Sequence, residues 1–272
     1  MKKTSLLCLL IGLLALSSCR QPAPRVSIFA DHIATIAHQE NISFAEAAIR
    51  VRALGYEGVD VSTTIAADRL RTLDSLGFCH ACAIANIGYI DGPQEAAEEQ
   101  ALAFMKAQGW SQLLLVPGLV PEGTDDDTVE EAIARIAAFV ERAAGEGLRV
   151  MVEDYDNPRS LCYNTAALDR LFAASPVLGH VFDTGNYLYC HEDVLQALDH
   201  FRSRVQHVHL KDRRDDGSCP AVGDGIVPMA EVIGRLRASG YEGWLTVEHY
   251  GSRTMYDDAS RSIAAVRAIM AK

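Results

Sequence analysis

The feature that most constrains the fold of this chain is a regular alternation of short apolar runs with longer amphipathic segments. Eight runs have the length, the apolar content and the flanking turn residues expected of buried strands. They span residues 26–30, 58–62, 79–86, 112–117, 148–154, 178–184, 205–210 and 244–249. Between them, apolar residues recur three and four positions apart, which is the spacing of an amphipathic helix.

The segment 128–144 shows the helical spacing most clearly. We expect Asp127 to cap its N-terminus, and Gly145 and Gly147 to end it. One face of this helix carries Val129, Ile133, Ile136, Ala137 and Val140. A last helix is expected over 253–272. Two similar stretches, "LGYEGVD" from Leu54 and "SGYEGWL" from Ser239, predict that a helix ends at a left-handed glycine shortly before a strand.

Eight strand–helix repeats predict one α/β domain with parallel strands and right-handed crossovers. The most economical closure is a (β/α)8 TIM barrel over residues 26–272, because barrels of roughly 250 residues fold as one domain. A doubly wound open sheet is the alternative. No GxGxxG motif follows the first strand, so the dinucleotide-binding version of that sheet lacks its signature.

The N-terminus has the features of an export signal. Lys2 and Lys3 precede an apolar run that is shorter than the about 20 residues needed to span a bilayer. The ending "LSSC" resembles a bacterial lipoprotein signal. We therefore expect a signal peptide at 1–18, a lipidated Cys19 and a tether at 19–25, which would anchor the protein to the cell envelope on its periplasmic or surface side. An ordinary signal peptide cleaved nearby is the alternative.

Charge and cysteine content narrow the function further. The formal net charge is 25 − 36 = −11, and removal of the two leader lysines makes it −13. Such an acidic chain repels phosphate backbones, so nucleic-acid binding is disfavoured. Five cysteines follow Cys19, which leaves at least one unpaired within the chain. Cys79 and Cys82 have CxxC spacing, but positions three apart in a strand face opposite sides, so we interpret them as small buried residues.

Acidic residues stand at the ends of three of the predicted strands. Glu153, Asp183 and Glu248 each follow an apolar run, and His209 lies in the strand between the last two. In a TIM barrel these strand ends meet at the catalytic face. A buried carboxylate is costly unless it is paired or binds a metal. Three carboxylates and an imidazole therefore predict one divalent cation, Mn²⁺ or Mg²⁺ in preference, with Zn²⁺ and Co²⁺ as alternatives.

The run "VQHVHLKD" places polar residues at every second position. His207, His209 and Lys211 share one face of the strand, and Val208 and Leu210 share the other. We expect His209 to be the metal ligand and His207 to lie one layer deeper, packed or hydrogen-bonded in the barrel. Lys211 would then lie above the metal, within reach of a bound anion or carbonyl.

Five motifs occur in order over the second half of the chain: "VEDYD", "VFDTGN", "HVHLKD", "VGDGIVP" and "VEH". Their order and spacing resemble the sugar phosphate isomerase/epimerase family of xylose-isomerase-like barrels. The resemblance implies one divalent ion held by Glu153, Asp183, His209 and Glu248. It also implies that Glu153 and Glu248 act as acid and base, moving a proton next to the carbonyl of a sugar or keto-sugar through an enediolate.

Two departures leave the substrate open. The epimerase pattern has a histidine at the position of Asn186 and an arginine at that of Asp215, although Arg213 and Arg214 are close by. We expect Lys211, Asn186 and Arg213 to bind substrate. A lyase or dehydratase on a keto-sugar and a non-catalytic carbohydrate-binding lipoprotein are the alternatives. The acidic charge and the export signal oppose an abasic-site endonuclease. A monomer and an oligomer are both compatible with the sequence.

Overall fold

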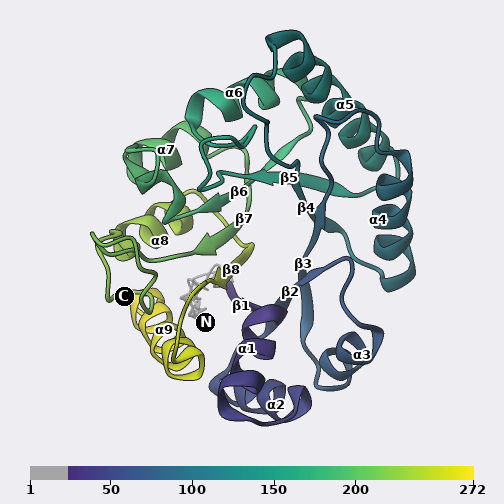
Figure 1. Ribbon diagram of the computed structural model, residues 1–272. Helices are drawn as coiled ribbons and strands as arrows, with labels where there is room; N and C mark the ends of the chain where they lie inside the picture. Colours follow the sequence, from purple (N-terminus) through teal and green to yellow (C-terminus); the bar gives the residue numbers. More distant parts are fainter. Residues whose placement is uncertain (1–23) are drawn as a thin grey trace, which may run out of the picture.

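The computed structural model describes residues 24–272, which form a closed barrel of parallel strands in the order β1 to β8. Figure 1 looks along the barrel, with the helices arranged around it. The strands are β1 (Arg25–Phe29), β2 (Gly58–Ser62), β3 (Cys79–Asn86), β4 (Gln112–Val116), β5 (Arg149–Glu153), β6 (Gly179–Asp183), β7 (Val205–Leu210) and β8 (Trp244–Val247). The expected (β/α)8 fold is confirmed. The expected signal peptide, Cys19 and residues 19–23 of the tether lie outside the described residues.

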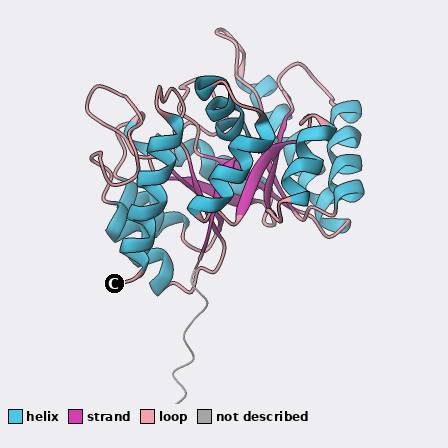
Figure 2. Cartoon of the chain, turned by 90° about the horizontal axis from the view of Figure 1, so that it is seen from below, coloured by secondary structure: helices cyan, strands magenta, loops and turns pink. Residues whose placement is uncertain are grey.

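Helices cover the outside of the barrel, as the perpendicular view in Figure 2 also shows. Two of them, α1 and α2, lie between β1 and β2, and a short 3-10 helix, η1, follows β6. The helices are α1 (Ala30–Glu40), α2 (Phe44–Leu54), α3 (Ala67–Ser75), α4 (Glu95–Gln108), α5 (Asp126–Gly145), α6 (Thr165–Ala174), η1 (Asn186–Leu188), α7 (Val194–Phe201), α8 (Met229–Ala238) and α9 (Met255–Met270). None of the helices in this part of the chain is long and apolar enough to cross a membrane.

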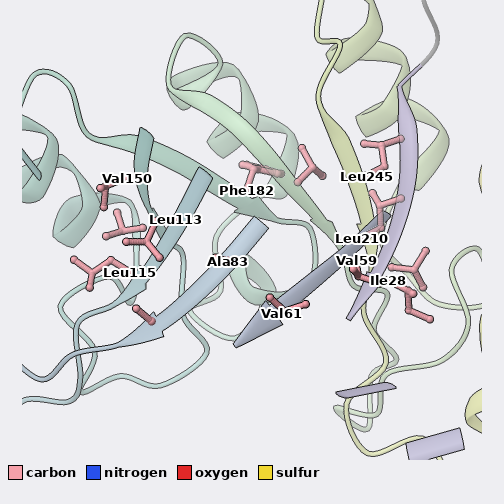
Figure 3. Close-up of a cluster of buried hydrophobic side chains, with 14 of the residues drawn as sticks. Ile28, Val59, Val61, Ala83, Leu113, Leu115, Val150, Phe182, Leu210 and Leu245 are labelled. Carbon is pink, nitrogen blue, oxygen red and sulfur yellow. The ribbon is translucent and has the colours of Figure 1, made fainter. Parts of the chain in front are cut away.

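The main hydrophobic core lies between the strands and the helices. Every second residue of each strand points outward into it, as Figure 3 shows for Ile28, Val59, Val61, Leu113 and Leu245. This alternation follows from the twofold period of a strand. It leaves the other half of the strand residues to fill the inside of the barrel.

The inside of the barrel is apolar on one side and polar on the other. Cys82, Leu114, Met151 and Val181, from β3 to β6, form a small hydrophobic cluster. On the opposite side, β1, β2, β7 and β8 contribute the hydrogen-bonded group Ser27, Asp60, His207 and Thr246. His207 lies in this layer, below His209, and its Nε2 is 2.8 Å from Asp60 Oδ2.

The expected N-cap of the helix predicted at 128–144, Asp127, was wrong by two residues. Helix α5 begins at Asp126, and Asp125 caps it with an extended backbone and a side chain that accepts a hydrogen bond from Thr128 N at 2.7 Å. Asp127 lies inside the first turn. Either acidic residue suits a helix N-terminus, and only the backbone conformation distinguishes cap from first turn.

Smaller features follow the expected pattern. Gly55 ends α2 with φ 101°, and Gly240 follows α8 with φ 82°, both in the left-handed region. The first strand begins at Arg25, the last residue of the expected tether, and α9 is shorter than the segment 253–272. The five cysteines of residues 24–272 are free. Cys82 is buried as expected, but the expectation was wrong for Cys79, which is the exposed first residue of β3.

Candidate active site

A cavity of about 590 Å³ opens at the carboxyl ends of the barrel strands. Each strand, or the residues directly after it, contributes at least one side chain to its lining. In strand order these include Phe29, Asp60, Ile84, Leu114, Glu153, Asn186, His209 and Glu248. The polar groups come mainly from β5 to β8, while β3 and β4 supply an apolar wall of Ile84, Leu114 and Val116. A polar group facing an apolar wall is typical of a small-molecule site.

Four potential ligand atoms gather at this end of the barrel, and three of them belong to residues that line the cavity, Glu153, His209 and Glu248. One side-chain atom each from Glu153, Asp183, His209 and Glu248 lies within 4.8 Å of all the others. His209 Nδ1 is 2.6 Å from Glu153 Oε1 and 3.4 Å from Glu248 Oε2. All four residues are at most 8% exposed. The structure thus brings together the four residues that the sequence predicted as ligands.

The Lys211 side chain reaches into the same group, closer to the carboxylates than we expected. Its Nζ lies 2.5 Å from Glu248 Oε1, 3.2 Å from Asp183 Oδ2 and 2.9 Å from Asn186 Oδ1. Burial alone would lower the pKa of this ammonium group, but the carboxylates of Asp183 and Glu248 outweigh burial and hold the pKa well above its ordinary value. Lys211 is therefore charged and neutralises part of the acidic cluster.

One oxygen of the Asp183 carboxylate accepts hydrogen bonds from the following turn, and the other oxygen accepts none from the described part of the chain. Its Oδ1 accepts hydrogen bonds from the backbone N–H groups of Gly185 and Asn186 at 2.7 and 2.8 Å. Its Oδ2 is buried and has no hydrogen-bond donor within residues 24–272, since the Lys211 contact is an ion pair without hydrogen-bond geometry. Burial raises the pKa of this carboxyl group well above its usual range.

These features fit a divalent cation. Buried carboxylates with an oxygen left unbonded, next to an imidazole nitrogen, are the donors that Mn²⁺ and Mg²⁺ take in proteins. A doubly charged ion would also remove the penalty that burial places on Asp183. The part of the chain that the structure describes thus contains a candidate metal site, with His209 Nδ1 as the nitrogen donor.

The sequence interpretation missed Asp60, which lies directly under His209. Its Oδ2 is 3.2 Å from His209 Nε2 and 2.8 Å from His207 Nε2, and its Oδ1 accepts a hydrogen bond from Thr246 at 3.0 Å. We assign the Nε2 proton of His209 to this contact. The Nδ1 lone pair could then bind a metal, which would lie between Nδ1 and Glu153 Oε1, now 2.6 Å apart. The signal in the sequence was a lone acid inside the apolar strand 58–62.

Asp212 was also missed, and it explains why two of the motifs occur together. This buried carboxylate accepts hydrogen bonds from the backbone N–H groups of Gly223, Gly225 and Val227 at 2.8, 2.9 and 3.2 Å. A side chain at position 225 would collide with the Asp212 carboxylate, so the loop closes there only with glycine. The "KD" after β7 therefore anchors the "VGDGIVP" loop beside the cavity.

Two of the predicted substrate-binding residues, Asn186 and Arg213, line the cavity together with Lys211. Asn186 Nδ2 donates to the backbone oxygen of Asp154 at 2.6 Å, so its amide is fixed with Oδ1 toward Lys211. Arg214 and Asp215 are exposed and do not line the cavity. Arg213 thus occupies the active-site side of this loop.

Comparison with known proteins identifies the family. A model described as xylose isomerase-like TIM barrel matches residues 48–269, and the chain belongs to this family. Inosose dehydratase from Lacticaseibacillus casei is 23% identical over 246 residues, which cover 77% of this chain and 83% of that protein. The resemblance inferred from the motifs is confirmed.

Solved structures share the fold. The probable 3-DHS dehydratase AsbF from Bacillus anthracis has a TM-score of 0.73 and 16% identity, covering 89% of this chain and 98% of that one. An L-ribulose 3-epimerase has a TM-score of 0.71 and 18% identity, covering 91% and 95%. These structures establish the architecture, and their substrates are their own.

Proposed function

We propose that this protein is a metal-dependent enzyme that moves a proton next to the carbonyl group of a sugar or keto-sugar, as an isomerase or epimerase. The observation that carries the proposal is the cluster of Glu153, Asp183, His209 and Glu248, with ligand atoms within 4.8 Å of one another beside a 590 Å³ cavity. Membership of a family whose relatives include epimerases and dehydratases of such compounds supports it.

The four residues would hold one divalent cation, with Mn²⁺ as our first expectation. When bound, such an ion polarises a substrate carbonyl and so acidifies the neighbouring C–H bond. Asp60 would keep His209 in the tautomer that presents Nδ1. Metal analysis of the purified protein, repeated on Asp183→Asn and His209→Ala, tests the site: the wild type should retain one equivalent and each variant much less.

Glu153 and Glu248 are the proposed acid and base. They approach His209 from β5 and from the end of β8, which are separated by the two strands that carry Asp183 and His209. One carboxylate removes the proton at the carbon next to the carbonyl, and the other returns a proton. Lys211 Nζ, 2.5 Å from Glu248 Oε1, keeps that carboxylate ionised, which is the form that can accept a proton.

Isotope exchange tests this reaction. Incubation with Mn²⁺ in D₂O and a panel of ketoses and 3-keto-sugars should place deuterium next to the carbonyl of a substrate. Glu153→Gln and Glu248→Gln should each lower the exchange rate at least 100-fold, because positioned acid–base groups contribute about 10²–10⁴-fold.

The matched control is Glu242→Gln, which changes an exposed glutamate before β8, at the opposite end of the barrel. It should exchange at the wild-type rate. Retention of full exchange in both active-site variants would refute the assigned roles. Tight sugar binding without any exchange would favour a carbohydrate-binding protein instead.

Dehydration is the second candidate, because the curated relative from Lacticaseibacillus casei is an inosose dehydratase. Its first step is the same proton removal, after which a hydroxyl group on the next carbon leaves as water. The other glutamic acid would supply the proton to that hydroxyl group. Incubation with an inosose distinguishes the two: a dehydratase releases a product lighter by one water, and an epimerase a product of unchanged mass.

We further propose that the mature protein begins at a lipidated Cys19 and is anchored to the cell envelope. The support is the "LSSC" sequence after a charged start and an apolar run. The expressed full chain should fractionate with membranes and carry acyl chains on Cys19 by mass spectrometry. Cys19→Ala should abolish both, and an unmodified N-terminus elsewhere would contradict the anchor.

A further inference from the structure

An arginine side chain is buried at the cavity wall without an acidic partner. Arg213 is 4% exposed and lines the cavity. Across residues 24–272 no carboxylate lies within 4 Å of its guanidinium group, and its side-chain hydrogen bond goes from Nη1 to Cys219 Sγ at 3.4 Å. Sulfur is a weak acceptor for a group with five N–H donors. A buried charge is costly unless it is paired, so this guanidinium lacks a counter-ion.

The surrounding structure holds Arg213 firmly in this place. Its backbone N–H donates to Asp212 Oδ1 at 2.8 Å, and its backbone oxygen accepts from Ile226 N at 2.8 Å. A Cβ atom on Gly185 would lie 2.9 Å from Arg213 Cγ, so this glycine makes room for the side chain. The guanidinium carbon lies 3.2 Å above the ring centre of Tyr189. Because the backbone is held and the guanidinium contacts Tyr189 and Cys219, the charged group is preorganised for a ligand.

The two exposed carboxylates that line the cavity, Asp31 and Asp156, do not lie within 4 Å of this guanidinium group. The carboxylates of Asp183 and Glu248 are already paired with Lys211, which is the other lysine or arginine of the lining. The two side chains that contact the Arg213 guanidinium, Tyr189 and Cys219, carry no carboxylate. An anion that enters the cavity would supply the missing negative charge.

We propose that Arg213 forms an anion subsite and that the natural substrate carries a carboxylate in addition to its carbonyl group. The subsite itself stands on the contacts above, while the carbonyl half of the substrate rests on the proposed function. The substrate class would then be an acidic keto-sugar or keto-cyclitol, with the carboxylate at Arg213 and the carbonyl group over the four-residue cluster.

A carboxylate fits the subsite better than a phosphate. One face of the guanidinium is covered by Tyr189, and its remaining edge can donate two parallel hydrogen bonds to two oxygens in one plane. A phosphate carries close to two negative charges and needs further cations or several backbone N–H groups. Within residues 24–272, the other lysine or arginine of the lining is Lys211, which Glu248 engages, and the proposed metal ion would be occupied by the carbonyl group.

Alkylation of Cys219 tests the subsite without any assumption about the substrate. Iodoacetate and iodoacetamide form the same bond, in which the thiolate sulfur displaces iodide from carbon, but only iodoacetate carries a carboxylate. Arg213 should bind that carboxylate next to Cys219 Sγ, 3.4 Å from its Nη1. We expect the ratio of the iodoacetate rate to the iodoacetamide rate to be at least tenfold higher at Cys219 than at exposed Cys79, measured by peptide mass spectrometry.

Two Arg213 variants, and the use of a ratio of two alkylation rates, control this experiment. Arg213→Gln should bring the ratio at Cys219 down to that at Cys79, and Arg213→Lys should keep part of the difference. An effect of Arg213 on thiolate formation alone changes both rates equally and cancels in the ratio. Equal ratios at the two cysteines of the wild-type protein would overturn the subsite.

Three ligands with one carbon skeleton then test the substrate class by calorimetry on the Mn²⁺-loaded protein: D-fructose, D-fructuronate and D-fructose 6-phosphate. The carboxylate form should bind at least tenfold more tightly than fructose, and Arg213→Gln should remove that preference. Tighter binding of the phosphate, or a preference that survives Arg213→Gln, would overturn the carboxylate assignment. Neither experiment requires turnover, so both can succeed while isotope exchange fails.

Discussion

The pairing of His209 with Asp60 is the residue-scale feature on which the candidate metal site most depends. A histidine that binds a metal through one nitrogen usually donates its other N–H group to a carboxylate or carbonyl, and loss of that partner typically lowers metal affinity 10–100-fold. Asp60 Oδ2 is placed to accept from His209 Nε2 at 3.2 Å, while Thr246 and His207 hold the carboxylate from the sides.

Replacement of Asp60 should therefore weaken metal binding without removing a ligand. We expect Asp60→Asn to lower Mn²⁺ affinity 10–100-fold, measured by electron paramagnetic resonance of free Mn²⁺. Asp31→Asn is the control, because this exposed aspartate also lines the cavity and removes the same charge. An equal loss in the two variants would show a general charge effect and would count against positioning by Asp60.

A second residue-scale prediction concerns acid stability. His180 is buried among aromatic rings outside the barrel, with Nδ1 3.0 Å from Val152 O and Nε2 2.9 Å from Tyr187 Oη. Burial lowers its pKa from 6.5 to about 4. Between these two pH values His180 is protonated in the unfolded chain and neutral in the folded chain. This histidine therefore lowers the free energy of unfolding as the pH falls from 6.5 toward 4, by about 3 kcal/mol in total.

Urea unfolding at a series of pH values measures this contribution. Between pH 6.5 and 4.5 the free energy of unfolding of His180→Gln should fall less steeply than that of the wild type. His200→Gln is the control, since His200 is half exposed and forms an ion pair with Asp169. Parallel pH profiles for wild type and His180→Gln would contradict the prediction, whatever their offset.

At the scale of elements, the N-terminus of α5 separates two acidic residues that the sequence alone makes equivalent. Asp125 accepts a hydrogen bond from the backbone of Thr128, whereas Asp127 lies within the first turn and acts only through the helix dipole. We expect Asp125→Ala to lower the free energy of unfolding by about 1 kcal/mol, and Asp127→Ala by less than half of that. Asp125→Asn keeps the cap and should remain near wild type. A larger loss at Asp127 would contradict the assignment.

The elements after the strands differ in how they serve the cavity. The turn after β6 supplies Asp183, Gly185 and Asn186, and the loop after β7 is fastened to Asp212 through three backbone hydrogen bonds. This loop carries Arg213 and Cys219 to the cavity wall. Irregular segments thus hold cavity-lining groups in place because buried carboxylates satisfy their N–H groups.

At the scale of the whole molecule, the barrel divides its chemistry between two halves. The strands β5 to β8 end in the four candidate ligands, and β3 and β4 form the apolar wall opposite. A cation bound by those four residues would connect four neighbouring strands of a closed barrel. Its binding energy would then appear as stability of the entire fold.

Removal of metal should accordingly lower the melting temperature. With free Mn²⁺ at 100 times its Kd, binding stabilises the fold by about 2.7 kcal/mol, which corresponds to several degrees for a chain of this size. Scanning calorimetry with and without EDTA should show this shift in the wild type, and Asp183→Asn should show little or none. Identical melting temperatures in the wild type would contradict a folded-state metal site.

Much of the fold was readable from the chain itself. The eight strands lie within one or two residues of the predicted runs, because a buried parallel strand requires a continuous apolar run and a turn at each end. The alternation in "VQHVHLKD" likewise determined that His207, His209 and Lys211 share a face. The candidate ligands could be found because an acid at the end of an apolar strand has few other uses in a barrel.

Only the tertiary structure decided which distant side chains meet. The contacts of Asp60 with His209, of Lys211 with Glu248 and of Arg213 with Tyr189 join residues from different strands and loops. Their distances depend on the closure of the barrel and on the register between strands, which no local pattern encodes. The periodicity of one chain segment specifies a face, and the packing of all eight repeats specifies the partner.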